Sequence, residues 1–282
     1  MKPIKLLTIL ALLGSLSACE EDFLAEESEI EQNLTRYLVE TEMSALEVYN
    51  IVDRALTDED FIVTDSTTMA GAWVKRTTEL TIRVDFGNGA VGTDGVLRQG
   101  VIDLTLNDPD YNLAATEVKG EFLDFSADDR RFRGTFTITN LGDDDYSLIL
   151  EDFGINSEFR LNSEQTISWE GGRKTPEISD DTYQVAGSAL GEDTKTGDEV
   201  SLSIPEKIFY DRGCSDGLLG GVIDMNFTAG EDREVFYESG AIDFLLDDGE
   251  EKDGCNNLYE LTLTNTDGEE LTVTGTFENY NF

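Results

Sequence analysis

Residues 29–56 carry a helical pattern of apolar and polar positions. The apolar side chains recur at close to 3.6 residues, with Glu-rich positions on the opposite side: Ile30, Leu34, Leu38, Leu46, Tyr49, Val52 and Leu56. This pattern predicts one amphipathic helix near the N-terminus. We expect its apolar side to pack on a sheet or to cover an exposed edge strand, and binding of a partner is the alternative.

From about residue 72 the period changes to two. Polar and apolar residues alternate through several segments, and Gly, Asn and Asp turns such as Gly142-Asp143-Asp144-Asp145 separate them. The expected strands are 79–86, 100–106, 117–125, 135–139, 145–153, 164–170, 182–190, 219–228, 233–246, 257–265 and 270–274. Short strands at this spacing predict an all-β fold, mainly antiparallel, as a meander, a sandwich or an open barrel.

The strand region contains a faint internal echo. Gly100-Val101-Ile102-Asp103 returns as Gly221-Val222-Ile223-Asp224, and Gly134-Thr135-Phe136 returns as Gly275-Thr276-Phe277. The echo indicates two related β-units, 72–180 and 181–282, within one β-rich domain. Chance matches in Gly- and Thr-rich strands are the alternative, because such short repeats are weak evidence.

The N-terminus has the pattern of an export signal. Lys2 and Lys5 precede an apolar run that is too short to span a bilayer, and small residues then lead to Leu16-Ser17-Ala18-Cys19. This stretch resembles the lipobox of bacterial lipoproteins, which implies a signal peptide over 1–18 and a lipid on the Cys19 sulfur. An ordinary secretory signal with a chance cysteine is the alternative.

The composition narrows the function classes. Losing Lys2 and Lys5 with the signal would take the 20 basic residues to 18, against 60 acidic ones, and the net charge from −40 to −42. The negative net charge excludes nucleic acid as a partner, and an anionic membrane surface would repel the domain. Membrane contact is therefore expected only through the lipid. Histidine is absent, which excludes imidazole bases and His-ligated zinc.

Two cysteines remain once Cys19 is assigned to lipid. Cys214 and Cys255 each lie in a polar stretch that contains glycine, and an even pair in an oxidising compartment predicts a disulfide. A zinc site is disfavoured because two thiolates without histidine make a poor ligand set.

Residues 20–28 and 94–282 carry family resemblances. Glu20-Glu21-Asp22 begins an acidic tether, 19–28, and resembles the export signal of Bacteroidota surface lipoproteins. The later region resembles a group of such lipoproteins without a known function, on the segments Asp94–Ile102, Arg133–Asn140, Thr166–Trp169, Asp180–Gly187 and the two cysteines. The resemblance implies a β-rich domain at the outer-membrane surface. The turn around Cys255 is longer than in that group, and Asn256 replaces the usual aspartate.

Acidic clusters and strand aspartates are the candidates for chemistry. Asp108 and Asp110, and Asp247 and Asp248, offer oxygen ligands on turns and are weak candidates for structural calcium; no other cofactor is expected. The aspartates in or beside strands could form a glycosidase-like pair, although alternation places them on the solvent face: Asp103, Asp124, Asp224 and Asp243.

Aromatic residues on the strands have two interpretations. Stacking of sugars on a platform would use Trp73, Trp169, Tyr183, Tyr210 and Tyr237. Core packing is the more common role of strand aromatics, and we expect it here.

Together these features predict a lipid-anchored, surface-exposed outer-membrane protein. Its β-domain follows a helix and linker over 29–71. We expect a non-catalytic module that binds a glycan or a protein of the envelope, or that serves structurally. A carboxylate-dependent glycan hydrolase is the alternative.

Overall fold

The computed structural model describes residues 29–92, 95–156, 158–173, 175, 179–213, 218–230, 234–244 and 258–276. The signal peptide, the acidic tether and Cys19 lie outside the described residues, as do Cys214 and Cys255. Asp247 and Asp248 of the second calcium candidate also lie outside them.

The predicted helix is present as α2, Glu29–Thr57. It contains neither Gly nor Pro, so nothing in it favours a break before Thr57. The short α3, Glu59–Thr64, follows, with Asp58 at its N-cap accepting a hydrogen bond from the Phe61 amide. Neither described helix is both long and apolar enough to cross a bilayer.

Every described strand joins one antiparallel sheet. The bounds are β1 Ser66–Met69, β2 Ala72–Thr78, β3 Thr81–Asp85, β4 Ala90–Val91, β5 Leu97–Leu106, β6 Glu117–Ala127, β7 Arg130–Gly142, β8 Asp145–Ile155, β9 Phe159–Gly171, β10 Thr182–Asp193, β11 Glu199–Asp211, β12 Leu218–Thr228, β13 Ser239–Phe244, β14 Leu258–Thr264 and β15 Glu270–Thr276. The spatial order follows the chain from β1 to β15, except that β4 pairs only with β5. The predicted all-β fold with one N-terminal helix is confirmed, and among the predicted forms it is the open meander.

The sequence did not indicate four of these strands, β1, β2, β4 and β11. The omission of β11 is the most instructive, because this strand lies in the middle of the sheet between β10 and β12. It contains Pro205, a residue that argues against a central strand. The structure accommodates it at an irregularity, where the register against β12 shifts between Ser203 and Glu206.

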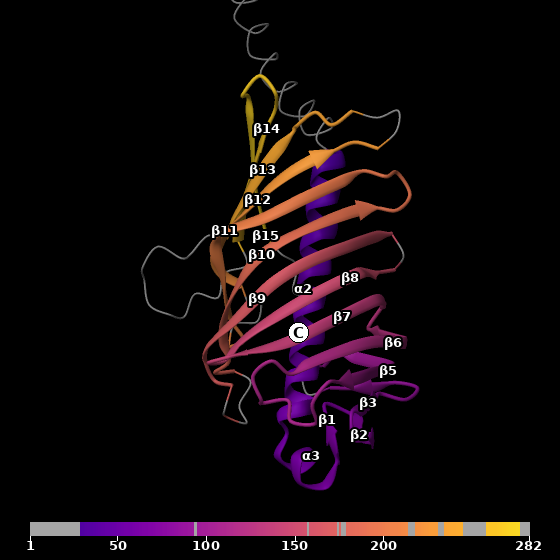
Figure 1. Cartoon of the computed structure of the whole chain (residues 1–282). Helices are drawn as coiled ribbons and strands as arrows, with labels where there is room; N and C mark the ends of the chain where they lie inside the picture. Colours follow the sequence, from indigo (N-terminus) through magenta and orange to yellow (C-terminus); the bar gives the residue numbers. More distant parts are fainter. Residues whose placement is uncertain are drawn as a thin grey trace, which may run out of the picture.

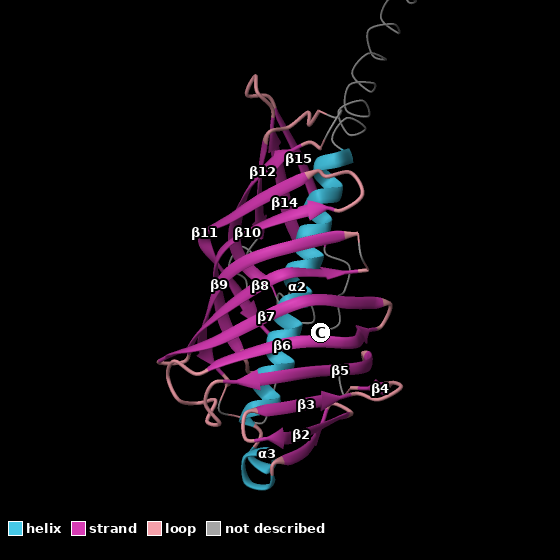
Figure 2. Cartoon of the chain, turned by 45° about the vertical axis from the view of Figure 1, so that its right-hand side comes forward, coloured by secondary structure: helices cyan, strands magenta, loops and turns pink. Residues whose placement is uncertain are grey.

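The sheet curves around α2, which runs across the strands along its inner side (Figures 1 and 2). A 29-residue helix is about 43 Å long, the width of about nine strands. Its first turns meet the β12 and β13 end, where Glu31 accepts hydrogen bonds from the amides of Phe236 and Tyr237. Its last turns reach Tyr111, on the connection between β5 and β6.

Aligned bulges produce part of this curvature. Gly100 in β5 has φ +85° and lies against Asp124 of β6, which has φ +52°. Gly134 in β7 and Asp152 in β8 repeat the arrangement, with φ of +85° and +50°. A Cβ at either glycine would collide with the carbonyl oxygen of its facing aspartate, so both positions require glycine. Register shifts at these points bend the strands.

Both copies of the Gly-Val-Ile-Asp motif begin with a positive-φ glycine, since Gly221 of β12 has φ +118° where Gly100 of β5 has +85°. The sheet continues without a gap between the two predicted units, since β9 and β10 pair from Gly171 and Thr182 to Phe159 and Asp193. The division into two related units stays a prediction.

Candidate functional site: an apolar pocket beside an enclosed helix

Several carboxylates of α2 are enclosed by the sheet. The sequence pattern placed its Glu-rich positions opposite the apolar ones, and we find Glu31, Glu47 and Asp53 no more than 3% exposed. Charged side chains are rarely buried so deeply without partners. The partners of each carboxylate therefore distinguish the groups that hold α2 in place from those that are left for a ligand.

Glu47 lies between two arginines from the sheet. Arg98 of β5 donates to Glu47 Oε1 through Nη2 at 2.8 Å and through Nε at 3.1 Å. Arg130 of β7 reaches Glu47 Oε2 at 3.3 Å and also donates to Ser44 Oγ at 3.1 Å. Glu47 and Arg98 are both 3% exposed, so this ion pair is fully enclosed and fixes α2 against β5 and β7.

Asp53 is also held by donors from outside the helix. Arg173, which follows β9, donates to it at 3.1 Å, and the Tyr111 hydroxyl donates at 3.0 Å. Arg173 also pairs with Asp144 at 3.0 Å and lies over the Tyr146 ring. Burial raises the pKa of Asp53, and Arg173 and Tyr111 oppose that rise. The arrangement holds the C-terminal part of the helix in place.

Most of the predicted aromatic platform belongs to the core. Tyr183, Tyr210 and Tyr237 are buried, and Tyr183 stacks on Tyr210 with centroids 5.0 Å apart. Trp169 packs against the core and donates to the hydroxyl of Tyr49 at 2.7 Å. Core packing is therefore confirmed for these residues.

Trp73 differs from the other aromatics of that set. It is 53% exposed on β2, and the ammonium of Lys75 lies 5.1 Å from its ring centre. It remains available to a ligand on the outer face of the sheet, the face directed away from α2.

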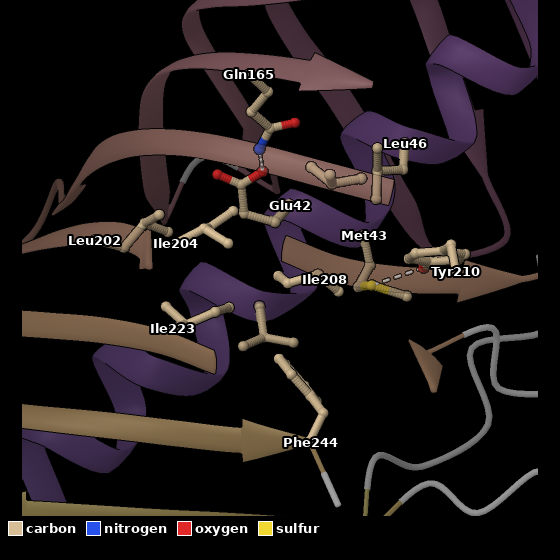
Figure 3. Close-up of a pocket in the computed structure, with 12 residues that line it drawn as sticks. Glu42, Met43, Leu46, Gln165, Leu202, Ile204, Ile208, Tyr210, Ile223 and Phe244 are labelled. Atoms are coloured by element: carbon tan, nitrogen blue, oxygen red, sulfur yellow. Dashed lines mark hydrogen bonds between the residues drawn. The ribbon is translucent and has the colours of Figure 1, made fainter. Parts of the chain in front are cut away.

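A pocket lies between α2 and strands β9 to β13 of the sheet (Figure 3). Its cavity volume is about 30 Å³, and its lining is Val39, Glu42, Met43, Leu46, Gln165, Val185, Leu202, Ile204, Ile208, Tyr210, Ile223 and Phe244. Glu42 and Ile204 are partly exposed, whereas most of the other lining residues are buried. The pocket is thus an apolar space with one carboxyl group near an edge that solvent reaches.

Glu42 has no cation beside it among the lining residues. Its Oε2 accepts a hydrogen bond from the Gln165 side-chain amide, drawn as a dashed line in Figure 3. Glu42 is partly exposed as a residue, but its carboxyl oxygen Oε1 is enclosed. Burial raises the pKa of this carboxyl from 4.5 to about 7, and the hydrogen bond from Gln165 opposes the rise only in part.

Two acceptors at the pocket are without a hydrogen-bond partner. They are Oε1 of Glu42 and Oε1 of Gln165. Gln165 is 3% exposed, so water outside the protein does not satisfy its amide oxygen. On the opposite wall, the Tyr210 hydroxyl donates to Met43 Sδ at 2.8 Å and is already engaged.

The first calcium candidate is organised as turns. Asp108 accepts from the amide of Asp110 at 2.9 Å, and Asp110 accepts from the amide of Asn112 at 3.0 Å. Within the described ranges, no group of at least three carboxylate, Cys or His side chains could hold a metal ion. Structural calcium stays a prediction, and half of its candidates lie outside those ranges.

The strand aspartates lie on the outer face of the sheet. Asp103 forms two hydrogen bonds with Arg83, at 2.7 and 2.8 Å, and Asp124 pairs with Arg131. Asp224 and Asp243 are exposed. Their positions agree with the alternation of the strands, and none of the four lines the pocket.

The comparisons with known proteins place the chain in no group: no family model, no curated protein and no solved structure matches it.

Sequence reasoning missed the residues that define this site, Glu42 and Gln165, and the buried pair of Glu47 and Arg98. One signal was available, since Arg98 shares the strand parity of the core residues Ile102 and Leu104. Gln165 likewise shares the parity of Ile167 in β9. A polar residue in register with core positions is a sign of a partner inside the fold.

Proposed function

We propose that the chain is a lipid-anchored protein of the bacterial outer membrane whose sheet and enclosed helix form a non-catalytic binding module. The lipobox-like stretch before Cys19 and the acidic residues after it support the anchor and the surface location. The observation that carries the binding function is the pocket, an apolar space with a single carboxyl–amide pair at its edge.

The pocket favours binding over hydrolysis. Glycoside hydrolysis by carboxyl groups needs two of them on either side of the bond that breaks. Glu42 is the one acidic residue among the twelve that line the pocket. The exposed Asp243 lies opposite Glu260 across β13 and β14, but this pair is on the outer face, away from the pocket.

Two surfaces can take different ligands. The pocket lining is almost entirely aliphatic or aromatic and favours an apolar ligand over a glycan. A glycan or an envelope protein would bind instead on the outer face, where Trp73 is exposed.

The anchor is tested by metabolic labelling with a fatty acid in a bacterial host that processes lipoproteins. The full chain is expected to take up the label and to be cleaved by protease added to whole cells. Cys19→Ala is expected to lose the label. Equal labelling of both chains would contradict the anchor.

The non-catalytic part of the proposal is tested by assaying the purified chain for reducing ends released from a polysaccharide panel. We expect no turnover. Turnover that Asp243→Asn or Glu260→Gln abolishes would replace the binding module with the hydrolase.

A further inference from the structure

Two buried oxygen atoms at the pocket lack a hydrogen-bond partner. Glu42 Oε1 and Gln165 Oε1 lie on either side of the hydrogen bond that joins the two side chains (Figure 3). Gln165 Oε1 is an acceptor, and Glu42 Oε1 is an acceptor when the carboxyl is ionised; a buried acceptor without a partner weakens the fold. An occupant that donates hydrogen bonds would relieve that cost, whereas one that only accepts them would not.

The remaining walls define the other end of the occupant. Leu202, Ile208, Ile223 and Phe244 present only carbon to the cavity, and each is less than 9% exposed. The occupant therefore needs an aliphatic part beside its donor. Because the cavity is about 30 Å³, a short unbranched chain fits better than a ring system, and the flexible Met43 on α2 can move to admit more of it.

The charge around the pocket indicates which donor group the ligand carries. Neither Lys nor Arg is among the described residues that line the pocket, and the chain as a whole carries a net charge of −40. A carboxylate ligand would lie beside Glu42 without a counter-ion. An ammonium group supplies three donors and the positive charge that Glu42 lacks.

We propose that this pocket binds a primary aliphatic amine, with the ammonium group against Glu42 and Gln165 and the alkyl chain among Leu202, Ile208 and Ile223. The proposal rests on the binding function above and names its ligand class. Binding couples to a proton, because a Glu42 carboxyl that is protonated in the empty pocket loses its proton when the ammonium pairs with it.

The test compares propylamine, propanol and propanoate by titration calorimetry on the full chain near pH 7. We expect propylamine to bind about tenfold more tightly than propanol, because a charge-assisted hydrogen bond is roughly twice as strong as a neutral one. Propanoate is expected not to bind. The heat of amine binding should change with the ionisation enthalpy of the buffer, which reports the released proton.

Glu42→Gln is the decisive variant, and Glu164→Gln is its matched control. Glu164 precedes Gln165 in β9 but is exposed on the outer face. We expect Glu42→Gln to lose the preference for the amine and the proton release, and Glu164→Gln to keep both. Circular dichroism on both variants checks that they remain folded.

Each other outcome overturns a specific statement. Equal affinity for propylamine and propanol, unchanged by Glu42→Gln, would leave an apolar binding pocket and overturn the amine. Binding of none of the three would mean that water alone satisfies the two acceptors, and would overturn the pocket as a ligand site. Polysaccharide turnover would instead overturn the proposed function, and the amine titration does not report on it.

Discussion

Glu47 and Glu42 lie within two turns of each other on α2, but the sheet provides them with different partners. Glu47 meets two guanidinium groups, from Arg98 and Arg130, and is enclosed as an ion pair. Among the described residues, Glu42 meets only the neutral amide of Gln165, beside an apolar pocket. A buried carboxyl with cations can stay ionised, whereas one without them gains stability by keeping its proton. The same helix therefore carries a fixed anchor in one region and a titrating group in the other.

Removing the cation from Glu47 is expected to have the largest effect. Arg98→Met takes away the two hydrogen bonds that Arg98 donates to Glu47 and leaves this carboxylate enclosed beside Arg130. We expect a loss of about 3–5 kcal/mol in the free energy of unfolding, measured by urea denaturation. Adding Glu47→Leu should recover much of the loss, because the unpaired charge is then gone. No recovery in the double variant would show that the ion pair itself, rather than the stranded charge, dominates.

Removing the titrating group is expected to have the next largest effect, and its sign is fixed by the raised pKa. Glu42 holds a proton in the folded protein that the unfolded chain releases from about pH 4.5, so its contribution to stability falls as the pH rises and levels off above about 7. The shift from 4.5 to about 7 corresponds to about 3 kcal/mol.

Glu42→Gln should remove this part of the pH dependence and be more stable than the native chain at about pH 8, by urea denaturation across the pH range. The exposed Glu164→Gln should follow the native curve. Parallel curves for Glu42→Gln and the native chain would contradict the titration of Glu42.

Weakening the second anchor is expected to cost less. Tyr111→Phe removes one hydrogen bond to Asp53 and leaves Arg173 in place. A hydrogen bond to a charged group contributes about 1.5–3 kcal/mol, so a loss near the lower end is expected by the same denaturation measurement. A loss as large as that of Arg98→Met would mean that Tyr111, rather than Arg173, holds Asp53.

The smallest effect is expected on the outer face. Arg83 and Asp103 form a two-bond ion pair with side chains 45% and 35% exposed, where water competes with the pair. Arg83→Met should leave the melting temperature unchanged within error. A clear loss would remove the contrast between enclosed and exposed pairs on which the comparison depends.

The sequence predicted the helix and the strands better than it predicted which side chains of α2 are buried. The helix expected over 29–56 is Glu29–Thr57, and the alternating segments became strands because period and turn residues are local signals. The outward direction of Asp224 and Asp243 followed from the same alternation. The enclosure of Glu42, Glu47 and Asp53 could not be predicted in this way, because it depends on how far the sheet curves around α2.

The partners of these carboxylates were not predicted for the same reason, the curvature of the sheet. Arg98 is far from Glu47 in sequence, and only the curved sheet brings β5 against the middle of α2. Strand β11 was not predicted because it contains Pro205, and proline is disfavoured in central strands. The structure tolerates this proline because the register against β12 is irregular there.

The protonation of Glu42 can be measured directly by following its carboxyl carbon with NMR as the pH changes, with Glu42→Gln providing the assignment. A midpoint at about 7 is the result expected of a carboxyl enclosed beside the pocket without a cation. A midpoint near the ordinary value of 4.5 would show that Glu42 is hydrated or paired, and would contradict the difference between the two regions of α2.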